Sequence, residues 1–287
     1  MKVMASVVLS LWVIVTLMAE AQQAVDSQIE SRILQGFCGI ISDDPDLPGQ
    51  LLNGMKALGE PGRAALLAMA ARGREKPAGR ECAWNYLLDL KERRAISLLR
   101  PVLNDPKEPT RTRAHAALVL GHLNDTSVVD STVRLLKEDP SDPLAGGMTI
   151  RALAEIDSDA ARSALRAMFQ TPELSAWSGA LVEAVGRQRD VQALPLIIED
   201  VRRQGGGDSV GREAAAALAR IGTADSLVSM EAVVGGIGIK ERSHLVDVVN
   251  IIIAELRNQL AHPLGRATPV QISAAIDHVQ LYLSQKP

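Results

Sequence analysis

The sequence predicts an all-α fold, a right-handed α-α superhelix in which about seven helical hairpins stack in a row. Three observations predict it. The chain of 287 residues is 47% hydrophobic but only 2% aromatic. One apolar pattern recurs at intervals of about 33 residues. Turn-forming residues separate these recurrences at regular positions along the chain.

The apolar residues are mainly Ala, Leu, Val and Ile. Ala and Leu favour helices, and their small or flexible side chains let neighbouring helices approach closely. The cores of β-sandwiches usually contain more aromatic and β-branched residues than this chain supplies. The composition therefore favours helices packed on helices.

Residues 1–21 have the features of a signal peptide. Lys2 precedes the uncharged apolar run Val3–Met18, and Ala19-Glu20-Ala21 places small residues at the positions a cleavage site requires. The run is shorter than the roughly 20 apolar residues of a full membrane span, although an uncleaved N-terminal anchor remains the alternative. We expect export to the periplasm or the cell exterior.

The recurrent pattern is Ala-x-x-Leu-small-x-apolar, and each copy contains one central apolar anchor. Spacings of 29 to 33 residues separate the anchors Leu58, Leu87, Leu120, Leu153, Val185 and Leu218, with a seventh unit expected near Ile251. We therefore assign residues 22–46 to an N-terminal capping helix, 47–256 to the repeats and 257–287 to a C-terminal capping helix.

Each unit is predicted to contain two short amphipathic helices joined by a turn, such as the one at Asn124-Asp125-Thr126. Asp142-Pro143 combines a helix N-cap with proline at the first helical position. Thr268-Pro269-Val270-Gln271 predicts a capping box at the start of the last helix. Neither helix of a hairpin can bury its apolar face alone, so neighbouring hairpins must stack.

Two segments carry a resemblance to a known family. Ala116–Asp125, and Glu183–Gly186 followed by Ala193–Leu196, resemble HEAT repeats, most of all the short variety found in phycobilisome lyases. The resemblance covers about Leu51 to Leu256. It implies a protein-binding scaffold from a bacterial host, with the first helix of each hairpin outside and the second on the concave face. Its motif specifies fold well and function poorly.

If the second helices line the concave face, one row of charged residues would point into it. Positions 13 or 14 residues after each anchor are occupied by Arg72, Arg100, Arg134, Arg166, Glu199 and Glu231. Guanidinium groups bind carboxylates and phosphates through paired hydrogen bonds, so this second-helix row suits an acidic protein partner. The alternative is a solvated row that bridges adjacent helices.

One enzyme motif is present. Gly207-Asp208-Ser209-Val210-Gly211 has the form G-x-S-x-G, which in serine hydrolases requires a strand, a strained turn and a helix. The preceding residues Leu194–Arg203 have a helical pattern, so we expect Asp208 or Ser209 to cap the helix that begins near Gly211. No metal-ligand spacing or phosphate-binding loop occurs, and the sequence predicts no cofactor.

The two cysteines, Cys38 and Cys82, both fall in patterns interpreted as helical. In an oxidising compartment they could form a disulfide, and the alternative is that each is a small buried apolar residue. The net charge of −3 and a pI near 6.0 lack the basic excess that nucleic-acid binding requires. This argues against a DNA-repair glycosylase built on the same architecture.

We therefore predict an exported, non-catalytic scaffold that binds a protein partner along its concave face. Two alternatives stay open: a phycobilin lyase or chaperone, and an exported serine hydrolase that uses Ser209.

Overall fold

The computed structural model describes residues 28–34, 38, 47–72, 79–139, 141–204, 208–236, 242–263 and 266–285. Every regular element in this part of the chain is a helix, which confirms the predicted all-α class. The α-helices that follow residue 46 pair into seven consecutive hairpins, the predicted number, counted over the described residues. The chain forms two compact units, Met1–Val102 and Leu103–Pro287, called unit 1 and unit 2 below.

The predicted signal peptide, residues 1–21, lies outside the described residues. Within the predicted capping segment 22–46, residues 28–34 are helical and Cys38 lies in a bend rather than in a helix. Across the described ranges, no helix is both long enough and apolar enough to cross a membrane.

Unit 1 contains α2 (Leu47–Ala57), α3 (Gly59–Ala70), α4 (Arg80–Asp89) and most of α5 (Ala95–Asn104). Helix α3 packs against α4, and the fully buried indole of Trp84 donates a hydrogen bond of 3.2 Å to the carbonyl of Ala70. A large apolar ring at this junction explains how two short helices bury enough surface to pack stably.

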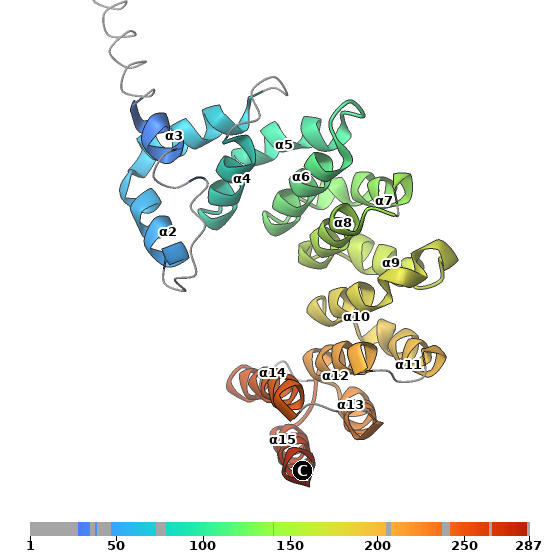
Figure 1. The fold of residues 1–287 in the computed structure, drawn as a ribbon. Coiled ribbons are helices and arrows are strands. Elements are labelled where there is room, and N and C mark those ends of the chain that lie inside the picture. The colour runs from blue at the N-terminus through green and yellow to red at the C-terminus, as the bar shows by residue number, and fades with distance from the viewer. Residues whose placement is uncertain are drawn as a thin grey trace, which may run out of the picture. The chain divides into compact units, whose positions relative to one another are not determined.

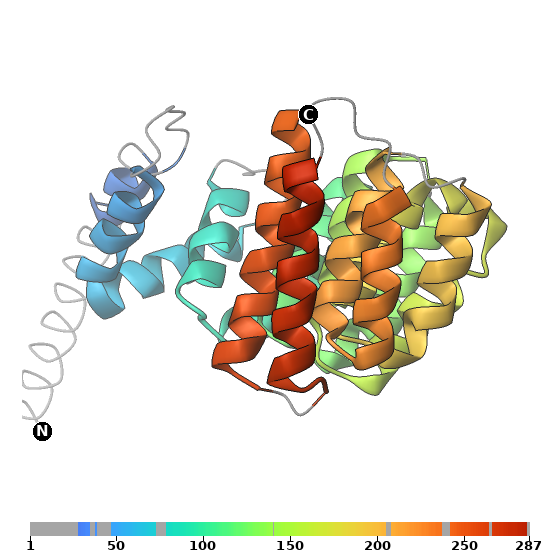
Figure 2. The same ribbon diagram turned by 90° about the horizontal axis from the view of Figure 1, so that it is seen from below.

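Unit 2 continues the same alternation of helices and tight turns. Its elements are α6 (Thr110–His122), η1 (Thr126–Val128), α7 (Val129–Glu138), α8 (Pro143–Glu155), α9 (Asp159–Met168), η2 (Pro172–Trp177), α10 (Ser178–Arg187), η3 (Val191–Ala193), α11 (Leu194–Arg203), α12 (Asp208–Ile221), α13 (Ala224–Gly236), α14 (Arg242–Ala261) and α15 (Pro269–Gln285). Figure 2 shows these helices running side by side, with α14 and α15 at the C-terminal end of the stack.

The helices of unit 2 form two curved layers. The first helices of the hairpins, α6, α8, α10, α12 and α14, lie on the inner side of the arc, and α7, α9, α11 and α13 lie on the outer side (Figure 1). The expectation that the second helices line the concave face is therefore wrong in unit 2. The reason is packing: α6 meets α8, and α10 meets α12, far more extensively than the second helices meet one another.

Two glycines allow this close approach between first helices. A Cβ placed on Gly121 would lie 2.4 Å from the carbonyl oxygen of Ala152, and one on Gly186 would lie 2.7 Å from the Cα of Ala217. Both contacts are with the backbone or Cα of the next first helix, so no side-chain rotation could relieve them. The small residues of the repeat thus draw the inner layer together, which curves the stack toward that side.

Three of the turns between first and second helices share one construction. A residue with positive φ ends the first helix at Lys91, Asn124 and Arg189. The next residue in each case is a buried acid: Glu92, Asp125 and Asp190. Asp125 and Asp190 then cap the following helical turn by accepting hydrogen bonds from the amides of Ser127 and Gln192. The turn predicted at Asn124-Asp125-Thr126 is confirmed, and each turn joins two helices with their polar ends satisfied.

The C-terminal end agrees with the prediction in one respect and differs in two. The capping box is confirmed, because the Thr268 amide donates to Gln271 Oε1 at 2.9 Å and the Gln271 amide donates to Thr268 Oγ1 at 3.3 Å. The boundary expected after residue 256 falls inside α14, so α15 alone closes the stack. Ile251, the expected seventh anchor, is 51% exposed, and Ile252 and Leu256 are buried in its place.

Candidate functional site: the concave groove of unit 2

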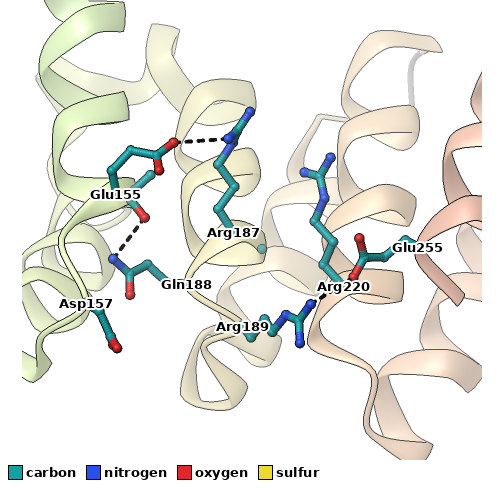
Figure 3. Close-up of a pocket in the computed structure, with 9 residues that line it drawn as sticks. Glu155, Asp157, Arg187, Gln188, Arg189, Arg220 and Glu255 are labelled. Carbon is teal, nitrogen blue, oxygen red and sulfur yellow. Dashed lines mark hydrogen bonds and ion pairs between the residues drawn. The ribbon is translucent and has the colours of Figure 1, made fainter. Parts of the chain in front are cut away.

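A pocket of about 470 Å³ opens where the C-terminal ends of three first helices meet the side of a fourth (Figure 3). Helices α8, α10 and α12 each end here, and α14 supplies the last wall. The lining residues are Ala154, Glu155, Asp157, Gly186, Arg187, Gln188, Arg189, Arg220 and Glu255. Seven of the nine are polar or charged, so the pocket suits a polar group rather than an apolar one.

Most charges in the pocket are paired within the protein. Arg187 Nη1 lies 3.1 Å from Glu155 Oε1, and Arg189 Nη2 lies 3.4 Å from Glu255 Oε1. Arg162 on α9 donates to Asp157 Oδ1 at 2.9 Å. Each acid of the pocket therefore has a guanidinium partner, and the pairs of Arg187 and Arg189 join different hairpins.

The wall of the pocket is fixed by side-chain amides that cap helix ends. Gln188 Nε2 donates to the carbonyls of Leu153 at 2.9 Å and Ile156 at 2.6 Å, which closes the end of α8. Gln259 Nε2 donates to the carbonyl of Ala219 at the end of α12. Carbonyls at a helix C-terminus lack intrahelical partners. These side-chain amides therefore supply hydrogen-bond donors to the carbonyls at the ends of α8 and α12 and help to fix the wall of the pocket.

Arg220 differs from the other pocket arginines. It is half-buried in the last turn of α12, and no described residue forms a hydrogen bond or ion pair with its side chain. In Figure 3 its side chain extends in the same direction as that of Arg187 on the neighbouring helix α10. Two guanidinium groups therefore project from adjacent first helices, and one of them lacks a counter-charge in the described part of the chain.

A second hollow of about 200 Å³ continues the groove along α8 and α10. It shares Ala154 and Arg187 with the larger pocket and is also lined by Arg151 and Glu183. Glu183 is paired with Arg187 at 3.0 Å. Arg151 is exposed, and no described residue pairs with it. We call the two hollows together the concave groove.

Burial shifts the pKa of two groups near the groove. Desolvation, with the nearby charge of Glu183, raises the pKa of Glu213 on α12. Desolvation, with repulsion from Arg189 and Arg162, lowers the pKa of Arg266, which donates to the carbonyl of Arg189 at 2.8 Å. Among the described residues, no group of three or more His, Cys, Asp or Glu side chains could hold a metal ion. The arrangement is suited to recognising charge.

The second-helix row lies elsewhere. Arg134 on α7, Arg166 on α9, Glu199 on α11 and Glu231 on α13 belong to the outer layer of unit 2, so they do not face the concave side (Figure 1). Arg72 follows α3 and Arg100 lies in α5, and both belong to unit 1. The four residues of unit 2 do not form the concave row expected from the sequence, because the second helices lie in the outer layer there.

Two members of the second-helix row form ion pairs within the protein. Arg166 binds the buried carboxylate of Asp190, and Arg72 binds Glu30. Arg134 is exposed and donates only a weak hydrogen bond of 3.3 Å to Ser131 Oγ. Glu199 lies 4.0 Å from Arg202, at the limit of an ion pair. The contacts of Arg166 and Arg72 support the alternative of a polar row that bridges helices, whereas those of Arg134 and Glu199 stay within one helix.

Sequence analysis missed the row that does face the groove. It lies two residues after the four anchors of unit 2, at His122, Glu155, Arg187 and Arg220, and the last three of these line the groove. His122 Nε2 lies 3.7 Å from Glu155 Oε1, and Glu155 in turn pairs with Arg187. The periodicity that located the anchors would also have located this row, had the correct layer been known.

The hydrolase motif has a different context from the one that catalysis requires. Ser209 lies in the first turn of α12, and the preceding element is helix α11 rather than a strand. The helix begins at Asp208, three residues earlier than expected. The strand, turn and helix of a nucleophile elbow are therefore not formed by the described residues on either side of Ser209.

The cysteines of unit 1 are close together. The sulfur atoms of Cys38 and Cys82 lie 2.00 Å apart and their Cα atoms 5.8 Å apart, which corresponds to a disulfide. The bond joins the segment that precedes α2 to the first turn of α4 across 44 residues. Of the two alternatives left open by the sequence, the structure has the bridge.

Fold and groove together define an all-α solenoid of the kind that presents an extended binding surface. Residues 107–178, which include α6, α8 and the hairpins around them, match the family model for HEAT repeats. This match, together with the helical hairpins that precede and follow it along the chain, supports a HEAT-repeat protein. No curated protein matches the chain significantly.

Proposed function

We propose that this protein is an exported, non-catalytic scaffold that binds a protein partner in the concave groove of unit 2. The observation that carries the proposal is Arg220, a half-buried guanidinium without a partner among the described residues, in a pocket where every acid is already paired. A charged group held in such a pocket is typical of a recognition site rather than of a structural ion pair.

Two features support export. Residues 1–21 have the charged start, apolar run and small-residue exit of a signal peptide. The bridge between Cys38 and Cys82 belongs to a class of bonds that persist in oxidising compartments such as the periplasm. N-terminal sequencing of protein from the envelope fraction tests this point. A start at Gln22 agrees with the proposal, and a retained Met1 would favour the membrane anchor.

Site-specific photo-crosslinking in the host tests where a partner binds. A photoreactive amino acid at Ala180, which lines the smaller hollow on α10, should yield a discrete crosslinked product. The matched control is Ala167, an exposed alanine on α9 in the outer layer. Equal crosslinking from both positions, or crosslinking from Ala167 alone, would contradict partner binding in the concave groove.

A further inference from the structure

The concave groove contains two arginines that pair with no described residue, one in each hollow. In the larger pocket Glu155 is paired with Arg187, Glu255 with Arg189, and Asp157 with Arg162. Arg220 is left without a counter-charge among the described residues. The pocket can therefore take up one carboxylate-sized anion without disturbing an existing pair.

The smaller hollow repeats this situation on α8. Its lining acid, Glu183, is held by Arg187 across one turn of α10. Arg151 projects from α8 into the same hollow and has no described partner. An anion bound here would also meet a single available guanidinium, which can donate two parallel hydrogen bonds to one carboxylate.

The two available arginines are separated by one hairpin. Arg151 lies on α8 and Arg220 on α12, with α10 between them. Packed helices lie about 8 to 10 Å apart, so the two side chains start roughly 16 to 20 Å from each other. An extended peptide covers about 3.3 to 3.6 Å per residue, so this distance corresponds to about five or six residues.

The residues between the two arginines are acidic as well as basic. Glu155, Glu183 and Glu213 all lie on the three helices that connect the two sites. Burial, together with the nearby carboxylate of Glu183, already raises the pKa of Glu213. A nucleic acid, with one charge per phosphate, would meet these carboxylates along its length. A ligand with only two, well separated negative charges would not place a charge beside these carboxylates.

Resting on the proposed function, we infer that the groove binds an extended acidic segment of the protein partner. Two carboxylate side chains of that segment, five or six residues apart, bind Arg151 and Arg220. The central part of the segment crosses α10 beside the Glu155–Arg187–Glu183 cluster, where uncharged polar residues fit best. Arg187 keeps its own partners, Glu155 and Glu183.

Fluorescence anisotropy with synthetic peptides tests this inference. The probe is a fluorescein-labelled Gly/Ser peptide with two glutamates six residues apart. The comparison peptides have both glutamates replaced by glutamine, or the two glutamates two residues apart. We expect the spaced diacid to bind about tenfold more tightly than either comparison peptide, since charge-assisted bidentate contacts are the strongest available here.

Two double variants with the same change in net charge assign the binding to the groove. Arg151→Gln with Arg220→Gln should weaken the spaced diacid at least tenfold. Arg134→Gln with Arg202→Gln, which alters exposed residues of the outer layer, should change its affinity less than twofold. Circular dichroism establishes that both variants keep their helices. If the first variant unfolds, Arg151→Lys with Arg220→Lys replaces it, with weaker binding expected from the loss of bidentate contacts.

The remaining outcomes show whether the inference fails alone or together with the proposed function. Equal affinity of both double variants for the diacid overturns the inference. So does tighter binding of a single-stranded DNA oligonucleotide or of inorganic phosphate at the same ionic strength. Crosslinking from Ala180 that survives Arg151→Gln with Arg220→Gln also overturns it, while the scaffold function stands. If the photoreactive residue at position 180 gives no crosslinked product when both arginines are present, the inference and the proposed function are both overturned.

Discussion

Arg166 on α9 donates a hydrogen bond from Nη1 to Oδ2 of Asp190, a carboxylate only 4% exposed in the turn after α10. The same carboxylate accepts a hydrogen bond of 3.1 Å from the amide of Gln192 in η3. One ion pair thus fixes the second helix of one hairpin to the turn of the next. An arginine that recurs at repeat spacing can therefore hold the stack together instead of meeting a partner.

Replacing Arg166 by alanine should destabilise the protein. We expect Arg166→Ala to lower the free energy of unfolding by about 2 kcal/mol, because Asp190 would stay buried without its cation. Urea denaturation followed by circular dichroism measures the change. Arg134→Ala, at the equivalent but exposed position of α7, is the control and should cost less than about 0.5 kcal/mol. Equal losses would mean that the pair with Asp190 contributes nothing.

Close packing of the inner layer predicts the effect of a single methyl group. Gly186→Ala would place a Cβ 2.7 Å from the Cα of Ala217, so α10 and α12 must move apart. We expect a loss of about 1 to 3 kcal/mol in unfolding free energy. Gly147→Ala is the matched control, because its Cβ would meet only a ring carbon of Trp177 at 4.0 Å. That change should be neutral or stabilising, since alanine favours helix more than glycine.

Glu92 makes the stability of unit 1 depend on pH. Hydrogen bonds from Arg94 lower the pKa of Glu92 from 4.5 to about 2, with a further contribution from Arg63 and against the opposing effect of burial. A carboxyl with a lower pKa in the folded state stabilises it fully above pH 4.5 and loses that contribution as the pH falls toward 2. Glu92→Gln should therefore cost most stability near neutral pH.

Urea denaturation at a series of pH values tests this expectation. The difference in unfolding free energy between the unaltered protein and Glu92→Gln should shrink as the pH falls from 4.5 to 2. Glu173→Gln, at an exposed position of η2, is the control substitution. A difference that is constant across this range would show that the contacts of Glu92 do not depend on its charge.

Reduction of the bridge between Cys38 and Cys82 should loosen unit 1. The bond closes a loop of 44 residues, and loops of this length contribute about 2 to 4 kcal/mol by restricting the unfolded chain. We expect a lower unfolding temperature in the presence of dithiothreitol. Cys38→Ser with Cys82→Ser should have the same lower temperature with or without reductant. Full alkylation of both thiols in protein isolated from the envelope, without prior reduction, would contradict the bridge in the cell.

Ser209 should not react as a nucleophile. It lies in the first turn of α12, and the described element before it is helix α11, whereas serine hydrolases place the nucleophile after a strand. A fluorophosphonate probe should leave the purified protein unlabelled, in parallel with an active serine esterase that is labelled. Labelling that disappears in Ser209→Ala would contradict the non-catalytic assignment.

The anchors show which buried positions the spacing of the repeat predicts correctly. Leu87, Leu120, Leu153, Val185 and Leu218 are all fully buried, as their spacing predicts. Leu58 is half-buried in the turn between α2 and α3, and Ile251 is exposed on α14, which at 20 residues is longer than the helices of the preceding hairpins. Stacked hairpins need a different geometry where they have only one neighbour, so the terminal units are the least regular.

The prediction of the site failed at a definite step. The second-helix row was located by a correct spacing applied to the wrong layer, and the first-helix row at His122, Glu155, Arg187 and Arg220 was overlooked. A shift of one residue rotates a side chain about 100° around a helix, so the spacing alone does not determine which row faces the groove. The pairing of Arg187 with Glu155 and the isolation of Arg220 depend on contacts between hairpins.

The sequence by itself determined that the chain is helical, how long its repeats are and where its turns and caps fall. These follow from the local spacing of apolar residues and from capping side chains, which act within a few residues. Only the tertiary structure decided which layer is concave and which arginines are available to a ligand. Both depend on how closely helices about 33 residues apart approach each other. Contacts such as that between Gly186 and Ala217 set this distance.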